Sequence, residues 1–206
     1  MTSRVAWGRV AWGVVAGLML VQAAALHLMG RVWICSCGSI RLWVGDIHSS
    51  ELSQQVLDWY TPSHIIHGML FYGLLHLALP RTPVLMRLAI AVGLEVAWEI
   101  AENSPPVIEA YRKQALAAGY VGDSILNSLS DTAMMSCGFW LASRLGGRTV
   151  LGLAVAMEIF TAVMIRDNLS LNVINLVAPS GWAPIRFIHD WQAGTHFGPQ
   201  PPAISR

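Results

Sequence analysis

The sequence predicts an all-α fold, a polytopic transmembrane helix bundle of about five spans with a short extracytoplasmic loop region. Three observations predict it. Of 206 residues, 54% are hydrophobic and only 12% are charged, with a mean hydropathy of +0.51, and a typical soluble domain is less apolar and more charged. Apolar runs of bilayer-spanning length recur along the chain. Nine Trp residues suit anchoring at a membrane interface.

Helix-ending residues separate the apolar runs. Pro80 and Pro83 follow the second run, 104–106 (Ser-Pro-Pro) follows the third, and 146–147 (Gly-Gly) follows the fourth, and both residue types end helices. Asp123 or Ser124 offers an N-cap. One integral membrane domain, residues 1–206, is therefore expected. Its spans are about 10–29, 64–79, 84–103, 124–145 and 149–166, with outer loops 30–63 and 104–122 and an outer tail 167–206.

The first run has two interpretations. Arg4 and Arg9 precede it, and alanines at 23–25 offer a cleavage site, as in a secretory signal. The run continues apolar past those alanines, which favours an uncleaved anchor.

The first outer loop contains a Cys-x-Cys pair. Cys35 and Cys37 are either two thiols or a strained disulfide, because zinc sites usually need two more ligands. Residues 41–46 are expected as a short strand and turn, and 51–60 as a short interfacial helix.

The positive-inside rule places the N-terminus in the cytoplasm. The basic residues that flank the inner ends of the expected spans are Arg4, Arg9, Arg81, Arg87, Arg144 and Arg148. Basic residues of the outer loops are diluted by acidic ones. The net charge of +1, with no basic run, gives no sign of a nucleic-acid partner.

The third expected span carries an acidic stripe. Glu95, Glu99 and Glu102 are spaced i, i+4 and i+7, so they share one helix face. Carboxylates at membrane depth are costly unless they face protein, water or an ion. The spacing therefore predicts a functional face on this helix.

Two neighbouring spans carry polar residues at helical spacing as well. His64 and His67 begin one span, and Asp123, Asn127 and Asp131 begin another. Placed by depth at ~1.5 Å per residue, these stripes match the acidic stripe level by level. They predict a cavity open to the outside, in which Glu99 and Asn127 lie within hydrogen-bond or single-ion reach.

The residue types favour a divalent cation. Carboxylates with imidazole suit zinc or manganese, and a bound cation would activate water for hydrolysis. The metal candidates are His64, His67, Glu99 and Glu102. The catalytic candidates are Glu99, Glu102, Asp123 and Asn127. The substrate-binding candidates are Arg166, Asp167, Asn168, Asp131 and Glu95. Without a metal, the carboxylates would act as acid and base or relay protons.

Four segments resemble a known family. They are DWYTPSHIIHG at 58–68, EVAWEIAEN at 95–103, GDSILNS at 122–128 and IRDNLSLN at 165–172. They are similar to the signature segments of an uncharacterised, unknown-function family of small bacterial inner-membrane proteins. The resemblance covers nearly the whole chain. It implies a multi-pass protein of the bacterial cell inner membrane and brings no established activity.

A weaker resemblance is to VanZ-like membrane proteins. These have a His early in one helix, a Glu late in the next and an Asp-x-x-x-Asn motif that opens the following helix. His67, Glu99, Asp123 and Asn127 follow that order. The usual Asp-Lys before the His is replaced here by 61–63 (Thr-Pro-Ser), and the Gly-rich continuation is missing. This resemblance therefore implies a shared architecture only.

Three functional classes follow. The first is a membrane enzyme, metal-assisted, that acts on a lipid-linked or periplasmic substrate. The second is a transporter of a cation or protons, which ranks lower because the polar stripes fade below mid-membrane. The third is a binding or assembly protein whose polar cluster only orders the bundle. The expected partners are the lipid bilayer and a lipid-linked or periplasmic ligand. The oligomeric state is left open.

Overall fold

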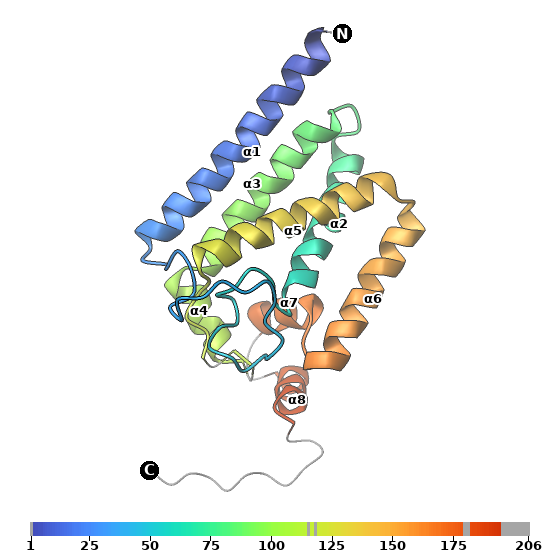
Figure 1. Ribbon diagram of the computed structural model, residues 1–206. Coiled ribbons are helices and arrows are strands. Elements are labelled where there is room, and N and C mark those ends of the chain that lie inside the picture. The colour runs from blue at the N-terminus through green and yellow to red at the C-terminus, as the bar shows by residue number, and fades with distance from the viewer. Residues whose placement is uncertain (1, 115, 118, 179–181, 195–206) are drawn as a thin grey trace, which may run out of the picture.

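The structure is a computed structural model that describes the chain except residues 1, 115, 118, 179–181 and 195–206. The expected outer tail, 167–206, is thus described only in part. The described residues form eight helices and no strand (Figure 1). The helices are α1 (Thr2–Leu28), α2 (Thr61–Ala78), α3 (Val84–Glu102), α4 (Pro105–Arg112), α5 (Ile125–Arg144), α6 (Gly147–Ile165), α7 (Leu169–Val177) and α8 (Ala183–Gln192).

The predicted all-α class is confirmed. Each of the five expected runs forms a long helix, α1, α2, α3, α5 and α6. Two stretches are long and apolar enough to cross a membrane, Gly8–Leu28 in α1 and Gly147–Ile165 in α6. The helices α2, α3 and α5 carry the polar stripes, so length and composition alone do not identify them as spans.

Three short helices were not expected, and local capping explains them. Pro105 and Pro106 end the run before them, but they also occupy the first positions of α4, where proline fits because the first turn lacks backbone acceptors. The Asn168 side chain caps α7 by accepting from the backbone N–H of Leu171. α8 again has proline in its first turn.

Two local expectations in the first outer loop are wrong. Residues 51–60 form turns and no helix, because Asp58 accepts from the backbone N–H groups of Ser53 and Tyr60 and so replaces helical hydrogen bonds. The expected strand at 41–46 is reduced to one isolated bridge, between Trp43 and Leu57.

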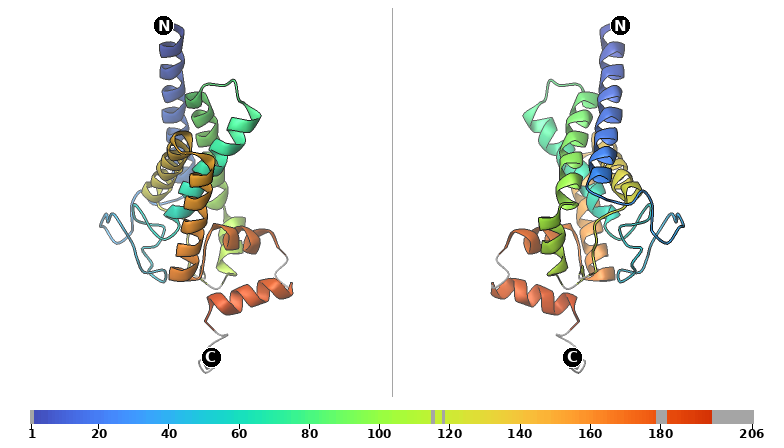
Figure 2. Two further views of the ribbon diagram at one scale, coloured as in Figure 1. Left: turned by 90° about the vertical axis from the view of Figure 1, so that its right-hand side faces the viewer. Right: turned by 90° about the vertical axis from the view of Figure 1, so that its left-hand side faces the viewer.

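Two helix pairs form the centre of the bundle. α2 packs most extensively on α5, and α1 on α3; Figures 1 and 2 show α1 running beside α3. The largest buried apolar cluster joins these helices and includes Leu88, Val92, Met135 and Phe139. Glycine allows the closest approach, since a Cβ at Gly68 would lie 1.9 Å from the Met135 carbonyl oxygen.

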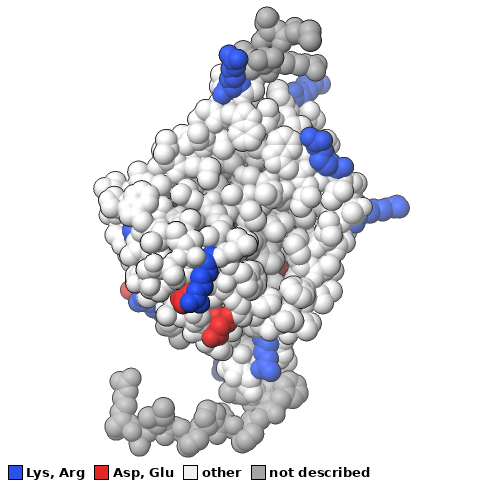
Figure 3. All heavy atoms as spheres, viewed as in Figure 1, with Lys and Arg blue, Asp and Glu red and all other residues white. Residues whose placement is uncertain are grey.

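The outer helices are largely exposed. Only 28% of the apolar window of α1 and 11% of that of α6 are buried, so most of their apolar side chains face outward. Figure 3 shows a broad uncharged face between Lys and Arg at the end near the N-terminus and charges of both signs at the opposite end.

The described residues of the two long loops, 29–60 and 113–124, and the short helices gather at one end of the bundle, opposite the N-terminus (Figure 1). The first outer loop, α4, α7 and α8 all lie there. The polar stripes on α2, α3 and α5 begin or end beside this cap.

Candidate functional site

A buried imidazole joins the three polar stripes. His64 Nδ1 lies 2.7 Å from Glu95 Oε1 and 3.5 Å from Glu99 Oε1, and its Nε2 lies 3.8 Å from Asp131 Oδ2. His67 Nδ1 reaches the other oxygen of Glu95 at 3.1 Å. α2, α3 and α5 thus contribute one connected cluster.

Two carboxylate oxygens of this cluster are buried without a hydrogen-bond partner. Ser128 donates its hydroxyl to Glu99 Oε2 at 2.6 Å, but Glu99 Oε1 has no partner, and neither has Asp131 Oδ1. Glu99 is fully buried and Asp131 is 5% exposed. Buried polar groups in folded proteins are nearly always satisfied. These oxygens therefore mark an incomplete site.

A second polar layer lies toward the capped end. Asp123 accepts from Asn103 Nδ2 at 2.6 Å and from the Tyr120 hydroxyl at 2.9 Å. Tyr111 hydrogen-bonds Glu102. Burial raises the pKa of Asp123 to about 6, although the bonds from Asn103 and Tyr120 lower it.

The tyrosines of this layer are neutral donors. Burial, together with the nearby carboxylates, raises the pKa of Tyr111 and of Tyr120 above the ordinary value. Burial, and then Asp167, raises that of Tyr60. Each phenol therefore stays protonated at neutral pH, and its hydroxyl donates a hydrogen bond to a carboxylate.

Gln22, which was not predicted from the sequence, and the predicted residue Asn127 hold the cluster in place. Gln22 of α1 donates to the Ser128 hydroxyl at 2.7 Å and accepts from Thr132 at 2.9 Å. Asn127 donates to the backbone carbonyl of Gln55 at 2.9 Å. Gln22 is fully buried; a lone amide in the middle of an apolar run is the signal that could have found it.

A cavity of about 540 Å³ opens beside the cluster, within the usual size range of ligand pockets. Its polar lining includes His64, His67, Glu102, Asp123 and Asp131. Tyr60, Tyr111 and Tyr120 line it as well. No Lys or Arg is among the described residues that line it.

The carboxylates and histidines form three groups that could hold a metal ion. They are His64, His67 and Glu95; His64, Glu99 and Asp131; and Glu99, Glu102 and Asp123. Within each group, one ligand atom per residue lies within 4.8 Å of the others. The four residues expected as ligands, His64, His67, Glu99 and Glu102, are thus divided among these groups. Glu95, Asp123 and Asp131 join them.

The polar residues of α2 do not lie at the depth that was predicted by matching the polar stripes. His64 was expected level with Glu102 and Asp123, but it contacts Glu95, Glu99 and Asp131. Ser128 is the α5 residue that hydrogen-bonds Glu99, whereas Asn127 bonds the loop. The glycines of α2 and α5 decide which turns of these two helices meet, and so bring His64 to Asp131; the contacts with α3 follow from its own packing against α2 and α5.

The three candidates after α6 lie elsewhere. Arg166 is exposed, ends α6 in the left-handed conformation and donates to the Trp191 carbonyl. Asp167 accepts from the Tyr60 hydroxyl at 3.1 Å and from Gln192 at 3.0 Å. Asn168 caps α7. Asp167 and Asn168 therefore both contact residues that line the cavity, Tyr60 and Asn172, whereas Arg166 bonds the Trp191 carbonyl.

The ionisation of Asp167 predicts a measurable pH dependence. Burial raises its pKa from 3.8 to about 6, helped by nearby Glu158 and opposed by bonds from Tyr60, Asn168 and Asn172. Because the folded-state pKa is the higher one, its contribution to stability is present below about pH 3.8 and is lost as pH rises through 6. Relative to an Asp167→Asn variant, the parent should lose about 2 kcal/mol between pH 4 and pH 7.

Thermal unfolding of both detergent-purified proteins across this pH range measures that difference. A difference between parent and variant that stays constant with pH would contradict the assignment.

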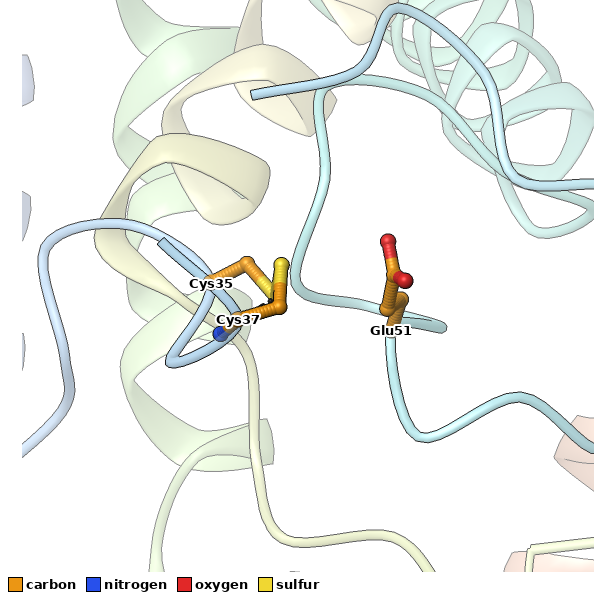
Figure 4. Close-up of side chains that lie close together, drawn as sticks. All are labelled: Cys35, Cys37 and Glu51. Atoms are coloured by element: carbon orange, nitrogen blue, oxygen red, sulfur yellow. Dashed lines mark hydrogen bonds between the residues drawn. A yellow bond between two sulfur atoms is a disulfide. The ribbon is translucent and has the colours of Figure 1, made fainter. Parts of the chain in front are cut away.

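The Cys-x-Cys pair is a disulfide. Cys35 and Cys37 are joined, with Cα atoms 5.2 Å apart, so of the two alternatives the structure contains the bonded one. Figure 4 shows them in one tight turn, with Glu51 on a neighbouring segment. Gln55 donates to Glu51 and to Cys37 Sγ. Cys137 is a free cysteine and is exposed, not a core residue.

Comparison with known proteins finds bacterial relatives that align with most of this chain. Residues 26–194 match a family described as protein of unknown function (DUF2585). A UPF0314 protein of Sinorhizobium fredii is 52% identical over 86% of this chain and 88% of its own. UPF0314 proteins of Sphingopyxis alaskensis and Brucella anthropi are 50% and 44% identical, over 93% and 91% of this chain and 97% and 92% of their own. No solved structure matches the chain.

Proposed function

The chain belongs to the DUF2585 family of unknown function, and since that family brings no activity with it, we propose a function from the cluster's geometry. The chain is an integral protein of the bacterial inner membrane. Its His/Glu/Asp cluster faces outward, binds a divalent cation and hydrolyses a lipid-linked or periplasmic substrate.

One observation carries this proposal. Glu99 Oε1 and Asp131 Oδ1 are buried without hydrogen-bond partners, and both residues share a group of metal-ligand spacing with His64. Two carboxylates and one imidazole suit zinc or manganese. A cation held by these residues would supply an activated water, because a bound cation lowers the pKa of water toward neutrality.

The chain's own groups supply the remaining chemistry. In hydrolysis the water oxygen would bond to the electrophilic centre of the substrate while the bond from that centre to the leaving oxygen breaks; a base takes the proton of the water, and an acid gives a proton to the leaving oxygen. Asp123, whose pKa burial raises to about 6, and Glu102 line the cavity beside the cluster. They are the residues proposed as base and acid.

Membrane insertion is supported by exposed apolar helices. α6 exposes Leu151, Ile159, Phe160 and Val163, from 53% to 74%, a surface that lipid would cover. If α2, α3 and α5 also span, every polar stripe faces protein or the cavity, as intramembrane carboxylates require.

The orientation has its own test. In a Cys137→Ser background, Lys113→Cys should react with a membrane-impermeant maleimide added to spheroplasts, and Arg148→Cys should react only after lysis. Both positions are exposed, at opposite ends of the bundle. The reverse labelling would place the cluster on the cytoplasmic side.

A structural role is the second candidate, and one observation favours it. Both oxygens of Glu95 are hydrogen-bonded to His64 or His67, so part of the cluster is satisfied without an ion. Transport finds less support, because buried Arg87 with His76 lies at the inner end of α2 and α3 and would repel a cation.

Metal content distinguishes these candidates. Inductively coupled plasma mass spectrometry of the detergent-purified protein should find about one zinc or manganese per chain. A metal-free protein that does not take up either ion on titration would overturn the proposal in favour of the structural role.

A further inference from the structure

The cavity beside the cluster has both polar and apolar lining residues. The polar lining includes His64, Asp131 and Glu102. The apolar lining includes Leu52, Phe71, Trp98, Leu169, Val173 and Leu176. These apolar side chains form an apolar chamber beside the polar groups, which is the usual lining of a site for a ligand with an apolar body.

One short helix separates this chamber from the outer surface. Leu169, Asn172, Val173 and Leu176 of α7 line the cavity, at the i, i+3, i+4 and i+7 spacing of one helix face. Apolar side chains outside this face are exposed too, Ile174 at 39% and Val177 at 74%. A helix that is apolar on several sides is typical of a protein core or of a membrane. At a membrane surface, such a helix would contact the cavity on one side and lipid on the other.

We propose that the apolar chamber under α7 binds the single acyl or prenyl chain of an amphiphile and presents its polar head to the His64/Glu99/Asp131 group. This inference rests on the proposed function and deepens it by naming the substrate class. α7 is the element that selects the chain, because it supplies one wall of the chamber and borders the bilayer.

The charge of the lining supports an amphiphile over a free soluble anion. Carboxylates are among the polar lining residues, and no Lys or Arg lies among the described lining residues. A phosphate or carboxylate head would therefore meet repulsion everywhere except at a bound cation. The apolar tail supplies the remaining attraction, since it leaves water on entering the chamber.

Photo-crosslinking tests this proposal on the full-length, detergent-purified protein loaded with zinc. The probe is palmitic acid with a mid-chain diazirine. Labelled peptides should map to α7 and to α2 near Phe71, and unlabelled palmitate or farnesyl phosphate should compete. Leu176→Trp fills the chamber and should reduce this labelling at least tenfold. Val177→Trp, the adjacent residue outside the lining, should change it less than twofold.

Two further measurements keep the test decisive. Leu52→Trp fills the chamber from the opposite wall and should reproduce the loss if Leu176→Trp does not fold. Zinc content, measured on every variant, should stay at the parent level in all three. Unchanged labelling in both chamber-filling variants, or labelling only on the exposed face of α6, would overturn the inference and leave the cation site standing. If the protein binds no zinc but is labelled, and unlabelled palmitate or farnesyl phosphate reduces that labelling, the proposed function is overturned. The amphiphile site is then still supported.

Discussion

Replacing Asp131 by Asn should remove most of the protein's affinity for zinc or manganese while leaving the metal-free fold at least as stable as the parent. Asp131 is 5% exposed. One of its oxygens has no hydrogen-bond partner, so without a cation its charge opposes folding. An amide of the same shape removes that charge and a ligand together.

We expect Asp131→Asn to lower the affinity for zinc or manganese at least tenfold. This is the lower end of the effect of residues that only hydrogen-bond the metal ligands. Thermal unfolding with and without added zinc gives the second readout. At a concentration of about 100 times its Kd, zinc should stabilise the parent by about 2.7 kcal/mol and should leave Asp131→Asn nearly unchanged. Glu99→Gln should behave in the same way.

Glu109→Gln is the matched control, because Glu109 is an exposed carboxylate of α4 outside the metal-spaced groups. It should keep the parent's metal content. A variant Asp131→Asn that binds zinc normally but unfolds at a lower temperature would show that the cluster only orders the helices.

Gly68→Ala should prevent correct packing of the bundle. A Cβ at this position would lie 1.9 Å from the Met135 carbonyl oxygen and 2.5 Å from the Phe139 nitrogen, and backbone atoms cannot move aside as a flexible side chain can. Gly138→Ala meets the Ile65 carbonyl oxygen at 2.0 Å. The expected cost is about 3 kcal/mol or more, at or above the upper end for overpacking, because α2 and α5 must separate.

Gly73→Ala provides the control on the same helix, since a Cβ there meets nothing within 4 Å. Size-exclusion profiles and melting temperatures in detergent compare the three variants. Gly73→Ala should match the parent or exceed it slightly, because alanine favours helix. Parent-like melting of Gly68→Ala would contradict the close crossing of α2 and α5.

That crossing also separates what could be read from the sequence from what could not. The long helices were predictable, because apolar runs, prolines and glycines act locally along the chain. The acidic face of α3 was predictable too, since the spacing of Glu95, Glu99 and Glu102 alone places them together. The cap at Ser124 is confirmed by its bond from the Asn127 N–H.

The partners across helices could not be predicted in the same way. Helical spacing says which residues share a face, but the angle and register between two helices depend on where their surfaces meet. Here Gly68 and Gly138 bring α2 and α5 together, and His64 meets Asp131 across that crossing. Its contacts with Glu95 and Glu99 depend on the packing of α2 against α3, at a different level from the one expected.

The sequence by itself determined that this chain forms apolar helices with polar stripes, because those features depend on neighbours three or four residues apart. Only the tertiary structure decided which carboxylates share an imidazole, that α7 forms a cavity wall, and that Gln22 of α1 supports the cluster. These contacts join residues that are distant along the chain. Their geometry depends on how side chains pack between helices, and the sequence of one segment does not contain that information.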